Sequence, residues 1–402
     1  MELFAGYPYW LMKAGLPYQY PKLTKNMECQ VLVLGGGISG ALAAYEFVSA
    51  GLDTILIDGR TIGLGSTSAS TSILQYELDV PLHRLEKIVG EHNARRAYQV
   101  CGQAVDGLVA LMLDTGFKVF TKAESLFFSI HGKEIKMLQK ECTARRASGF
   151  DVEFLNNEQV AERFGVTASA GIASSKAAIN NAYLLTHHLL QNSMKRGLRV
   201  FDRTKAISIR EKKGTVMIET ANGMAIRAGN VLNASGYEVV NFIKKKIVDL
   251  DCTYAIASET REDWDPGKNK AVMWSTDDPY LYLCETNDGR LMIGGRDERF
   301  VNFKSLHRDL EKKAAALEKD FEKLFPGETF RREFSWSGVF GKTKDSLPYI
   351  GRLNNDSNIY YALGFGGNGI TFSFAAAKIV VDLIRGIANE DANIFSFHRR
   401  SH

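Results

Sequence analysis

Three glycines near the N-terminus have the spacing of a phosphate-binding loop. Gly35, Gly37 and Gly40 form a GxGxxG pattern between the apolar run CQVLVL and the helix-forming segment ALAAYEFVSAG. In such a loop the first glycine permits a tight turn, the second lets the backbone approach a pyrophosphate, and the third lets helix and strand pack closely. Ile38 and Ser39 would open the helix, whose free N–H groups and partial positive charge attract phosphates. The spacing predicts a dinucleotide site.

An acidic residue follows where dinucleotide-binding units place their ribose contact. Asp58 ends the apolar run TILID, about twenty residues beyond the glycines. Its carboxylate would accept hydrogen bonds from both ribose hydroxyls and would repel a phosphate on the 2′ position, so the pattern disfavours NADP. Ser66, Thr67 and Ser68 then offer hydroxyls suited to the pyrophosphate, although a solvated Ser/Thr-rich loop is the alternative.

A second glycine-rich loop, LGFGGNGITFSF, stands near the C-terminus at residues 363–374. It is followed by a segment with the pattern of a helix, expected from about Ile370 to Ile384. Two such loops at opposite ends of one chain suggest that both ends of a single long ligand are held.

The elements around these loops narrow the kind of ligand. After the first β–α–β unit and a helical stretch, YLLTHHLLQNSMKRG, the chain continues with RVFDRTKAISIR, TVMIETAN and MAIRAGNVLNASG. These are three short alternating segments joined by tight turns, a pattern that predicts an antiparallel meander. A Rossmann-like half with a β-meander in place of a helical crossover resembles the FAD-binding fold of flavoprotein oxidases and reductases.

Composition excludes several other classes. The 402 residues carry a net charge of +4 with basic and acidic residues interspersed, which argues against a nucleic-acid partner. The five cysteines are odd in number and contain no CxxC, so a cytoplasmic location is expected. The longest uncharged run, at residues 357–377, is dense in Gly and Asn, so no membrane span is expected. No HExxH or cysteine cluster indicates a metal.

Five segments together resemble the D-amino-acid-oxidase-like family of FAD-dependent amine and amino-acid oxidoreductases, which includes glycine, sarcosine and gamma-glutamylputrescine oxidases. They are VLVLGGGISGALAAYEFVSAGLDTILID, GNVLNASG, DGRLMIGGRDE, WSGVFGKTKDSLPYIG and NIYYALGFGGNGITFSFAAAKIVVDLIRG. The resemblance implies an α/β (α+β overall) fold with two domains. Residues 1–80, 166–236 and 336–402 would form a Rossmann-like FAD-binding domain with a β-meander. Residues 81–165 and 237–335 would form a substrate domain with a mainly antiparallel sheet.

The resemblance also implies how FAD is held. The first loop would bind the pyrophosphate, and the helix after the second loop would stabilise negative charge on the reduced isoalloxazine ring. Because no His or Cys lies between Gly59 and Tyr76, where some relatives tether their flavin, non-covalent binding is expected. The expected contacts are Gly35, Gly37, Ile38, Ser39, Gly40, Asp58, Gly59, Arg60, Ser66, Thr67, Ser68, Thr71, Ser72, Ala206, Ala234, Gly236, Gly364, Gly366, Gly367, Gly369, Ile370 and Thr371. Thr71 and Ser72 replace a glycine pair that relatives often carry.

Two departures from the family bear on the substrate. Phe340 stands where glycine-oxidase-like members carry an Arg that binds the substrate carboxylate, and Thr371 stands where sarcosine-oxidase-like members carry a Lys. A carboxylate without a charge partner loses more hydration than it regains in a water-poor site. The sequence therefore favours an amine without an α-carboxylate, although Lys342 or Arg296 would supply the missing charge if either reached the site.

No catalytic residue is evident from the motifs, so pocket candidates are chosen by position. Tyr254 is preferred among the aromatic residues, because in relatives its strand faces the flavin; Trp274, Tyr280 and Tyr282 fit a core at least as well. The candidates are Gln75, Tyr76, Tyr254, Phe340, Lys342, Asn368 and Thr371.

The predicted activity is oxidation of the C–N bond of a small amine or amino acid. The substrate would pass a hydride to flavin N5, the imine would hydrolyse, and oxygen or another acceptor would reoxidise the flavin. Three alternatives remain: an FAD-dependent dehydrogenase of a polyol phosphate, a flavin-dependent tRNA-modifying oxidase, and a non-catalytic FAD-binding protein.

Overall fold

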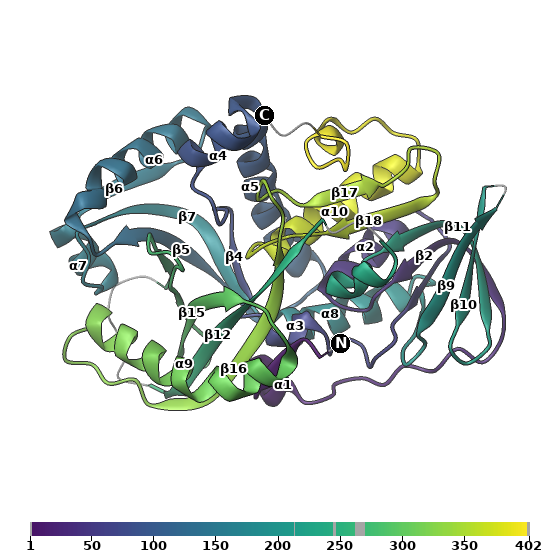
Figure 1. Ribbon diagram of the computed structural model, residues 1–402, viewed down its shortest axis with the longest axis horizontal. Helices are drawn as coiled ribbons and strands as arrows, with labels where there is room; N and C mark the ends of the chain where they lie inside the picture. Colours follow the sequence, from purple (N-terminus) through teal and green to yellow (C-terminus); the bar gives the residue numbers. More distant parts are fainter. Residues whose placement is uncertain (1, 213, 244–246, 262–269, 400–402) are drawn as a thin grey trace.

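The chain folds around two β-sheets that lie side by side, the larger on the left of Figure 1 and the smaller on the right. The computed structural model describes residues 2–212, 214–243, 247–261 and 270–399. Both glycine-rich loops belong to the smaller sheet and lie at the ends of its strands.

The central strands of the smaller sheet are parallel and buried. β2 (Met27–Leu34) pairs in parallel with β3 (Thr54–Ile57) on one side and with β11 (Ala225–Asn233) on the other. β11 in turn pairs in parallel with β18 (Ile359–Leu363). All four residues of β3 are buried, which explains its uninterrupted apolar sequence. The strand order is β17 (Tyr349–Arg352), β18 (Ile359–Leu363), β11 (Ala225–Asn233), β2 (Met27–Leu34), β3 (Thr54–Ile57) and β8 (Arg199–Phe201).

The predicted meander is confirmed. β9 (Ala206–Lys212) pairs antiparallel with β10 (Thr215–Thr220), which pairs antiparallel with β11. β11 then returns to the sheet beside β2 and ends at Asn233, directly before Ala234 and Gly236. The last meander strand therefore delivers the NASG segment to the same sheet edge as the first glycine loop.

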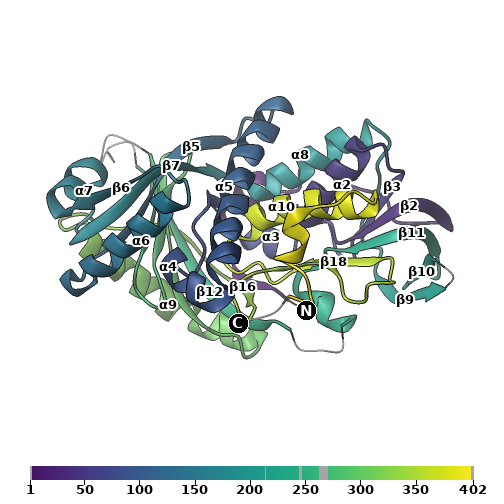
Figure 2. The same cartoon turned by 90° about the horizontal axis from the view of Figure 1, so that it is seen from above.

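Helices cover one face of this sheet. α2 (Ile38–Ser49), α8 (Ala182–Met194) and α10 (Gly369–Ile384) lie next to one another in Figure 2, and α5 (Glu91–Asp114) runs past α10 toward the larger sheet. α2 and α10 are apolar on most sides, as expected of helices packed between other elements. Because α2 and α10 each follow a glycine loop, their packing brings the two loops together.

The larger sheet is mainly antiparallel. Its strand order is β1 (Phe4–Gly6), β16 (Arg332–Lys342), β12 (Asp249–Thr260), β15 (Arg290–Arg299), β14 (Tyr282–Glu285), β13 (Ala271–Ser275), β5 (Phe120–Ser129), β7 (Ala170–Asn180) and β4 (Ile73–Gln75), with β6 (Val152–Asn156) beside β7. The β13–β5 pair is parallel. The predicted fold class, a Rossmann-like part with a meander and a part with a mainly antiparallel sheet, is confirmed.

Several strands join the larger sheet although the predicted domain ranges placed them with the smaller one: β1, β4, β7 and most of β16. Sheet membership alone does not define domains, so the boundaries given by the sequence analysis stay a prediction. The remaining elements are α1 (Tyr9–Ala14), α3 (Ser66–Ala69), α4 (Leu82–Val89), the 3-10 helix η1 (Gly132–Glu134), α6 (Ile135–Ala147), α7 (Asn157–Phe164), η2 (Gly236–Asn241), α9 (Phe303–Leu324) and η3 (Glu390–Asn393).

Candidate active site

A cavity of about 890 Å³ lies between the two sheets and is lined by both glycine loops. Most predicted contacts line it, although they come from distant parts of the chain. The predicted cofactor contacts among its lining residues are Gly35, Gly37, Ile38, Ser39, Asp58, Gly59, Arg60, Ser66, Thr67, Thr71, Ala206, Ala234, Gly236, Gly364, Gly366, Gly367, Gly369 and Ile370. Of the pocket candidates, Gln75, Phe340 and Asn368 also line it.

Four predicted cofactor contacts lie outside the cavity lining. Gly40 packs against the loop, and a Cβ there would come within 1.8 Å of the carbonyl oxygen of Gly35. The buried hydroxyl of Ser68 donates to the carbonyl of Gly65, 2.9 Å away, and that of Ser72 accepts from the amide of Ala182, 3.0 Å away. Thr371, the fourth, donates to the carbonyl of Gln75 at 3.3 Å. Ser68, Ser72 and Thr371 thus form hydrogen bonds with the protein backbone at positions where contacts with the cofactor were expected.

Two pocket candidates are corrected by the direction of their side chains. Tyr76 is buried and stacks on Phe150, with ring centroids 4.3 Å apart. The side chain of Tyr254 lies on the face of β12 that is turned away from the cavity, where its hydroxyl donates to Glu298 at 2.6 Å. Since side chains alternate along a strand, the neighbours of Tyr254, Thr253 and Ala255, line the cavity instead.

Neither cation considered as a substitute carboxylate-binding group is free. The ammonium of Lys342 lies 3.1 Å from a carboxylate oxygen of Asp251. Arg296 donates to Asp320 of α9, with Nε 2.7 Å from Oδ2. Neither Lys342 nor Arg296 belongs to the described residues that line the cavity.

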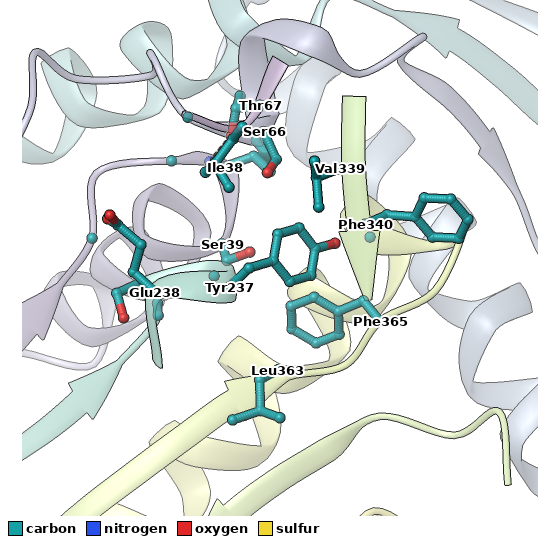
Figure 3. A pocket seen from close by; sticks show the side chains of 18 of the residues that line it. Ile38, Ser39, Ser66, Thr67, Tyr237, Glu238, Val339, Phe340, Leu363 and Phe365 are labelled. Atoms are coloured by element: carbon teal, nitrogen blue, oxygen red, sulfur yellow. Dashed lines mark hydrogen bonds between the residues drawn. The ribbon is translucent and has the colours of Figure 1, made fainter. Parts of the chain in front are cut away.

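The first loop presents backbone N–H groups to the cavity. Gly37 occupies the N-cap position of α2 and offers no side-chain cap. The hydroxyl of Thr67 accepts from the amide of Ile38 at 3.0 Å, and a Cβ on Gly37 would lie 2.8 Å from that hydroxyl. Figure 3 shows Ile38, Ser66 and Thr67 grouped together and Ser39 on the same side of the cavity as Glu238.

Asp58 closes the end of β3. Its carboxylate oxygens accept from the amides of Gly36, at 2.6 Å, and Arg60, at 2.7 Å. Burial raises the pKa of Asp58, and these two amides oppose the rise. The guanidinium of Arg60 pairs with Glu238 at 2.8 Å. Asp58 therefore orders the glycine loop and also lines the cavity.

The second loop is ordered by contacts from the segment that follows β4. Asn368 is the N-cap residue of α10, yet its side chain does not cap the helix. Its amide donates to the carbonyl oxygens of Gln75, at 3.2 Å, and Glu77, at 2.8 Å. Asp79 accepts from the amide of Gly367 at 3.0 Å. The N–H groups at the start of α10 are thus left without a side-chain cap beside the cavity.

Comparison with known proteins identifies the family. Residues 30–383 match the family model described as "FAD dependent oxidoreductase" (DAO). The chain belongs to this family. Gamma-glutamylputrescine oxidoreductase of Escherichia coli (strain K12) is 24% identical over 409 residues, covering 94% of this chain and 89% of the relative. Glycine oxidase of Bacillus licheniformis is 24% identical over 366 residues, covering 88% and 92%. The crystal structure of L-proline dehydrogenase from P. horikoshii superposes with a TM-score of 0.79 at 20% identity, covering 92% of this chain and 97% of that one.

The cavity of this FAD-dependent oxidoreductase fits its cofactor. Two helix N-termini whose own N-cap residues give no side-chain cap flank one space, which suits a ligand with a pyrophosphate at one point and an electron-accepting ring at another. The Cβ-free surface at Gly37 leaves room for phosphate oxygens, and the carboxylate of Asp58 suits a ribose. We therefore expect the pyrophosphate at α2 and the isoalloxazine ring at α10.

Several cavity residues were not predicted as site residues. Thr253, Tyr280, Tyr282 and Asp297 line the cavity from the larger sheet and its loops, and Tyr237 lines it from η2. The alternation in β12 signals only that one of its faces is covered, and Tyr280 and Tyr282 have the composition of an ordinary core. In the described part of the chain no group of three or more metal-ligating side chains forms, and no helix there is both long and apolar enough to span a bilayer.

Replacing Asp58 with alanine should weaken FAD binding. The change removes a charged acceptor, and charge-assisted hydrogen bonds are each worth about 1.5–3 kcal/mol. It also releases the amides of Gly36 and Arg60 that order the loop. Titration of the apoprotein with FAD would measure the loss. Asp53→Ala, on the chain just before β3 and paired with Arg199 at 2.6 Å, is the matched control, and equal affinities in both variants would contradict this role for Asp58.

Proposed function

We propose that this protein oxidises the C–N bond of a small amine or amino acid, with FAD bound non-covalently as the electron acceptor. The observation that carries the proposal is the single cavity that joins the two glycine loops to a pocket lined by the larger sheet. The names of the relatives support it, because glycine oxidase and gamma-glutamylputrescine oxidoreductase are named for nitrogen-bearing substrates. The bound cofactor supplies a hydride acceptor.

The chain's own residues would position the substrate and exclude water. Tyr237, Val339 and Phe365 lie close together at the cavity in Figure 3, and Phe340, which projects to the other side of β16, also lines it. Their rings and aliphatic groups would exclude water from this part of the cavity, so the field of the α10 N-terminus would be weakly screened there. That terminus would stabilise negative charge developing on the ring. No general base is needed if the amine enters uncharged.

The remaining parts of the proposal concern the surroundings of the reaction. Oxygen or another acceptor would reoxidise the cofactor. We place the protein in the cytoplasm, a location that the five unpaired cysteines support. Residues 1–80, 166–236 and 336–402 are proposed as the FAD-binding domain. Within these ranges, β1, β4, β7 and most of β16 belong to the larger sheet.

The test is anaerobic mixing of the holoprotein with a panel of alkylamines, diamines and simple amino acids. We expect at least one of them to bleach the flavin absorption band, and acid precipitation of the untreated protein should release the yellow colour. Bleaching by polyol phosphates alone would favour the alternative alcohol-oxidising activity. A band that no nitrogen compound bleaches would contradict the proposal.

A further inference from the structure

The charged side chains that line the cavity are unevenly distributed along it. Among the described lining residues, the cations are Arg60 and Lys205, both near Asp58 at the end of β3. At the other end the charged residues are Asp79 and Asp297, and both are acidic. The pocket beside the second glycine loop therefore presents only carboxylates among the described charged lining residues, whereas the end near Asp58 combines both signs, with Asp58 and Glu238 beside Arg60 and Lys205.

Asp297 is one of the residues that line this pocket. It follows a backbone irregularity in β15, where Gly295 and Arg296 have positive φ angles of 140° and 59° and the register with β12 shifts. Thr253 of β12 stands in the adjacent strand and pairs in register with Gly338 of β16. Asp297, Thr253 and Gly338 all line the cavity, so the irregularity turns a carboxylate toward it.

One oxygen of the Asp297 carboxylate can still accept a hydrogen bond. Its Oδ1 atom is buried and has no hydrogen-bond partner among the described residues. The hydroxyl of Thr253 contacts the hydroxyl of Tyr282 at 3.1 Å and donates to the carbonyl of Gly295 at 3.4 Å. Asp79, the other carboxylate, already accepts from Gly367 and, at 3.0 Å, from the hydroxyl of Tyr280. A buried unpaired acceptor costs stability unless a ligand satisfies it.

The surroundings of Asp297 offset only part of the cost of burying its negative charge. Burial raises its pKa to about 6, and the nearby carboxylates of Asp79 and Asp251 add to the rise. Thr253 and the ammonium of Lys342 oppose it, but Lys342 is already paired with Asp251. The other titratable groups that face Asp297 are the phenols of Tyr280 and Tyr282. A cation placed beside Asp297 would therefore give this carboxylate a direct charge partner, since the nearby Lys342 is paired with Asp251.

Aromatic rings complete a cation-binding environment. Tyr280 and Tyr282 line the same pocket, with ring centroids 6.1 Å apart, and Phe340 lines it from β16. Ring faces attract ammonium groups, most strongly where water is excluded. A carboxylate substrate would meet two carboxylates and no free cation among the described lining residues, which is repulsive in a poorly screened site.

We infer that Asp297 binds the ammonium group of the substrate, and that the substrate is an organic amine with no carboxylate beside its reacting nitrogen. This inference rests on the proposed function and specifies its substrate class. The amine loses its proton before oxidation, and Asp297 is positioned to accept that proton as well as to orient the nitrogen.

The test compares the holoprotein with Asp297→Asn and with Glu298→Gln as a matched control. Glu298 is the next residue of β15, pairs with Lys313 at 2.8 Å and points to the α9 side. The first probe is tetramethylammonium, which has no lone pair and cannot form an imine; the second is acetate. Shifts of the flavin absorption band measure the binding of both.

Tetramethylammonium should bind the unmodified protein and the Glu298→Gln variant alike. It should bind Asp297→Asn at least about tenfold more weakly, because a desolvated charge partner is lost. Lowering the pH through about 6 should weaken binding to the unmodified protein, since protonation removes the charge of Asp297, and should leave Asp297→Asn unaffected. Acetate should produce no comparable shift.

Tight acetate binding, or equal tetramethylammonium affinity in Asp297→Asn and the unmodified protein, would overturn the inference. The two proposals fail separately. If glycine or N-methylglycine bleaches the flavin and acetate binds, the inference fails and the proposed function stands. If tetramethylammonium binds through Asp297 but no nitrogen compound bleaches the flavin, the cation site stands and the proposed function fails.

Discussion

Gly37→Val should yield a folded protein that purifies without FAD. Gly37 lies at the N-cap of α2, and its backbone faces the cavity where the pyrophosphate is expected. A valine side chain would occupy that space, and its Cβ would come within 2.8 Å of the Thr67 hydroxyl that accepts from Ile38. Loss of several phosphate contacts, each worth about 1.5–3 kcal/mol, should lower the affinity by at least about a hundredfold.

The matched control is Gly132→Val. A Cβ at Gly132 meets no atom within 4 Å, and the residue lies in η1, away from the cavity. Flavin content after purification and titration of the apoprotein with FAD measure the effect, and circular dichroism checks that both variants are folded. A Gly37→Val protein with a full complement of FAD would show that the loop does not hold the pyrophosphate.

Arg145→Ala should lower the free energy of unfolding by about 3–5 kcal/mol, the usual cost of leaving a buried ionic group without its partner. The side chain of Arg145 is fully buried. Its guanidinium lies 2.7 Å from Glu141 and 3.3 Å from Glu77, whose side chains are also fully buried. The alanine variant would leave both carboxylates with no cation in contact except His83, 2.7 Å from Glu141, if that ring is protonated.

The loss should be largest at neutral pH. Burial raises the pKa of Glu77 even with Arg145 present, so the folded variant binds a proton more readily than the unfolded chain does. Its stability should therefore recover in part as the pH falls. Denaturant unfolding at several pH values measures this, with the exposed Lys140→Ala in the same helix as the control. A variant as stable as the control at neutral pH would contradict the prediction.

This network also bears on the active site. The backbone carbonyl of Glu77 accepts from the side chain of Asn368, the N-cap residue of α10. Disorder around Glu77 would therefore reach the second glycine loop. We expect Arg145→Ala to bind FAD more weakly than the Lys140 control even where both are folded.

The two glycine loops, the helices behind them and the meander were predictable because each depends on residues that are close in the chain. A tight turn at Gly35, an extended strand that ends directly before Asp58 and a helix N-terminus at Gly369 are local conformations with local sequence patterns. Their ligand follows from the same backbone, since uncapped N–H groups and a missing Cβ are properties of the main chain.

Tertiary structure decided which side chains face the ligand. Tyr254 looked suited to a pocket, but the pleat of β12 turns it toward Glu298 and presents Thr253 to the cavity. Lys342 was a candidate for a free cation until its pairing with Asp251 placed it elsewhere. Asp297 lies in the family-like segment DGRLMIGGRDE, but nothing in that segment indicated a role for its side chain. Its position depends on a register shift between β15 and β12 and on the packing of one sheet against another, and such contacts join residues whose separation along the chain carries no signal.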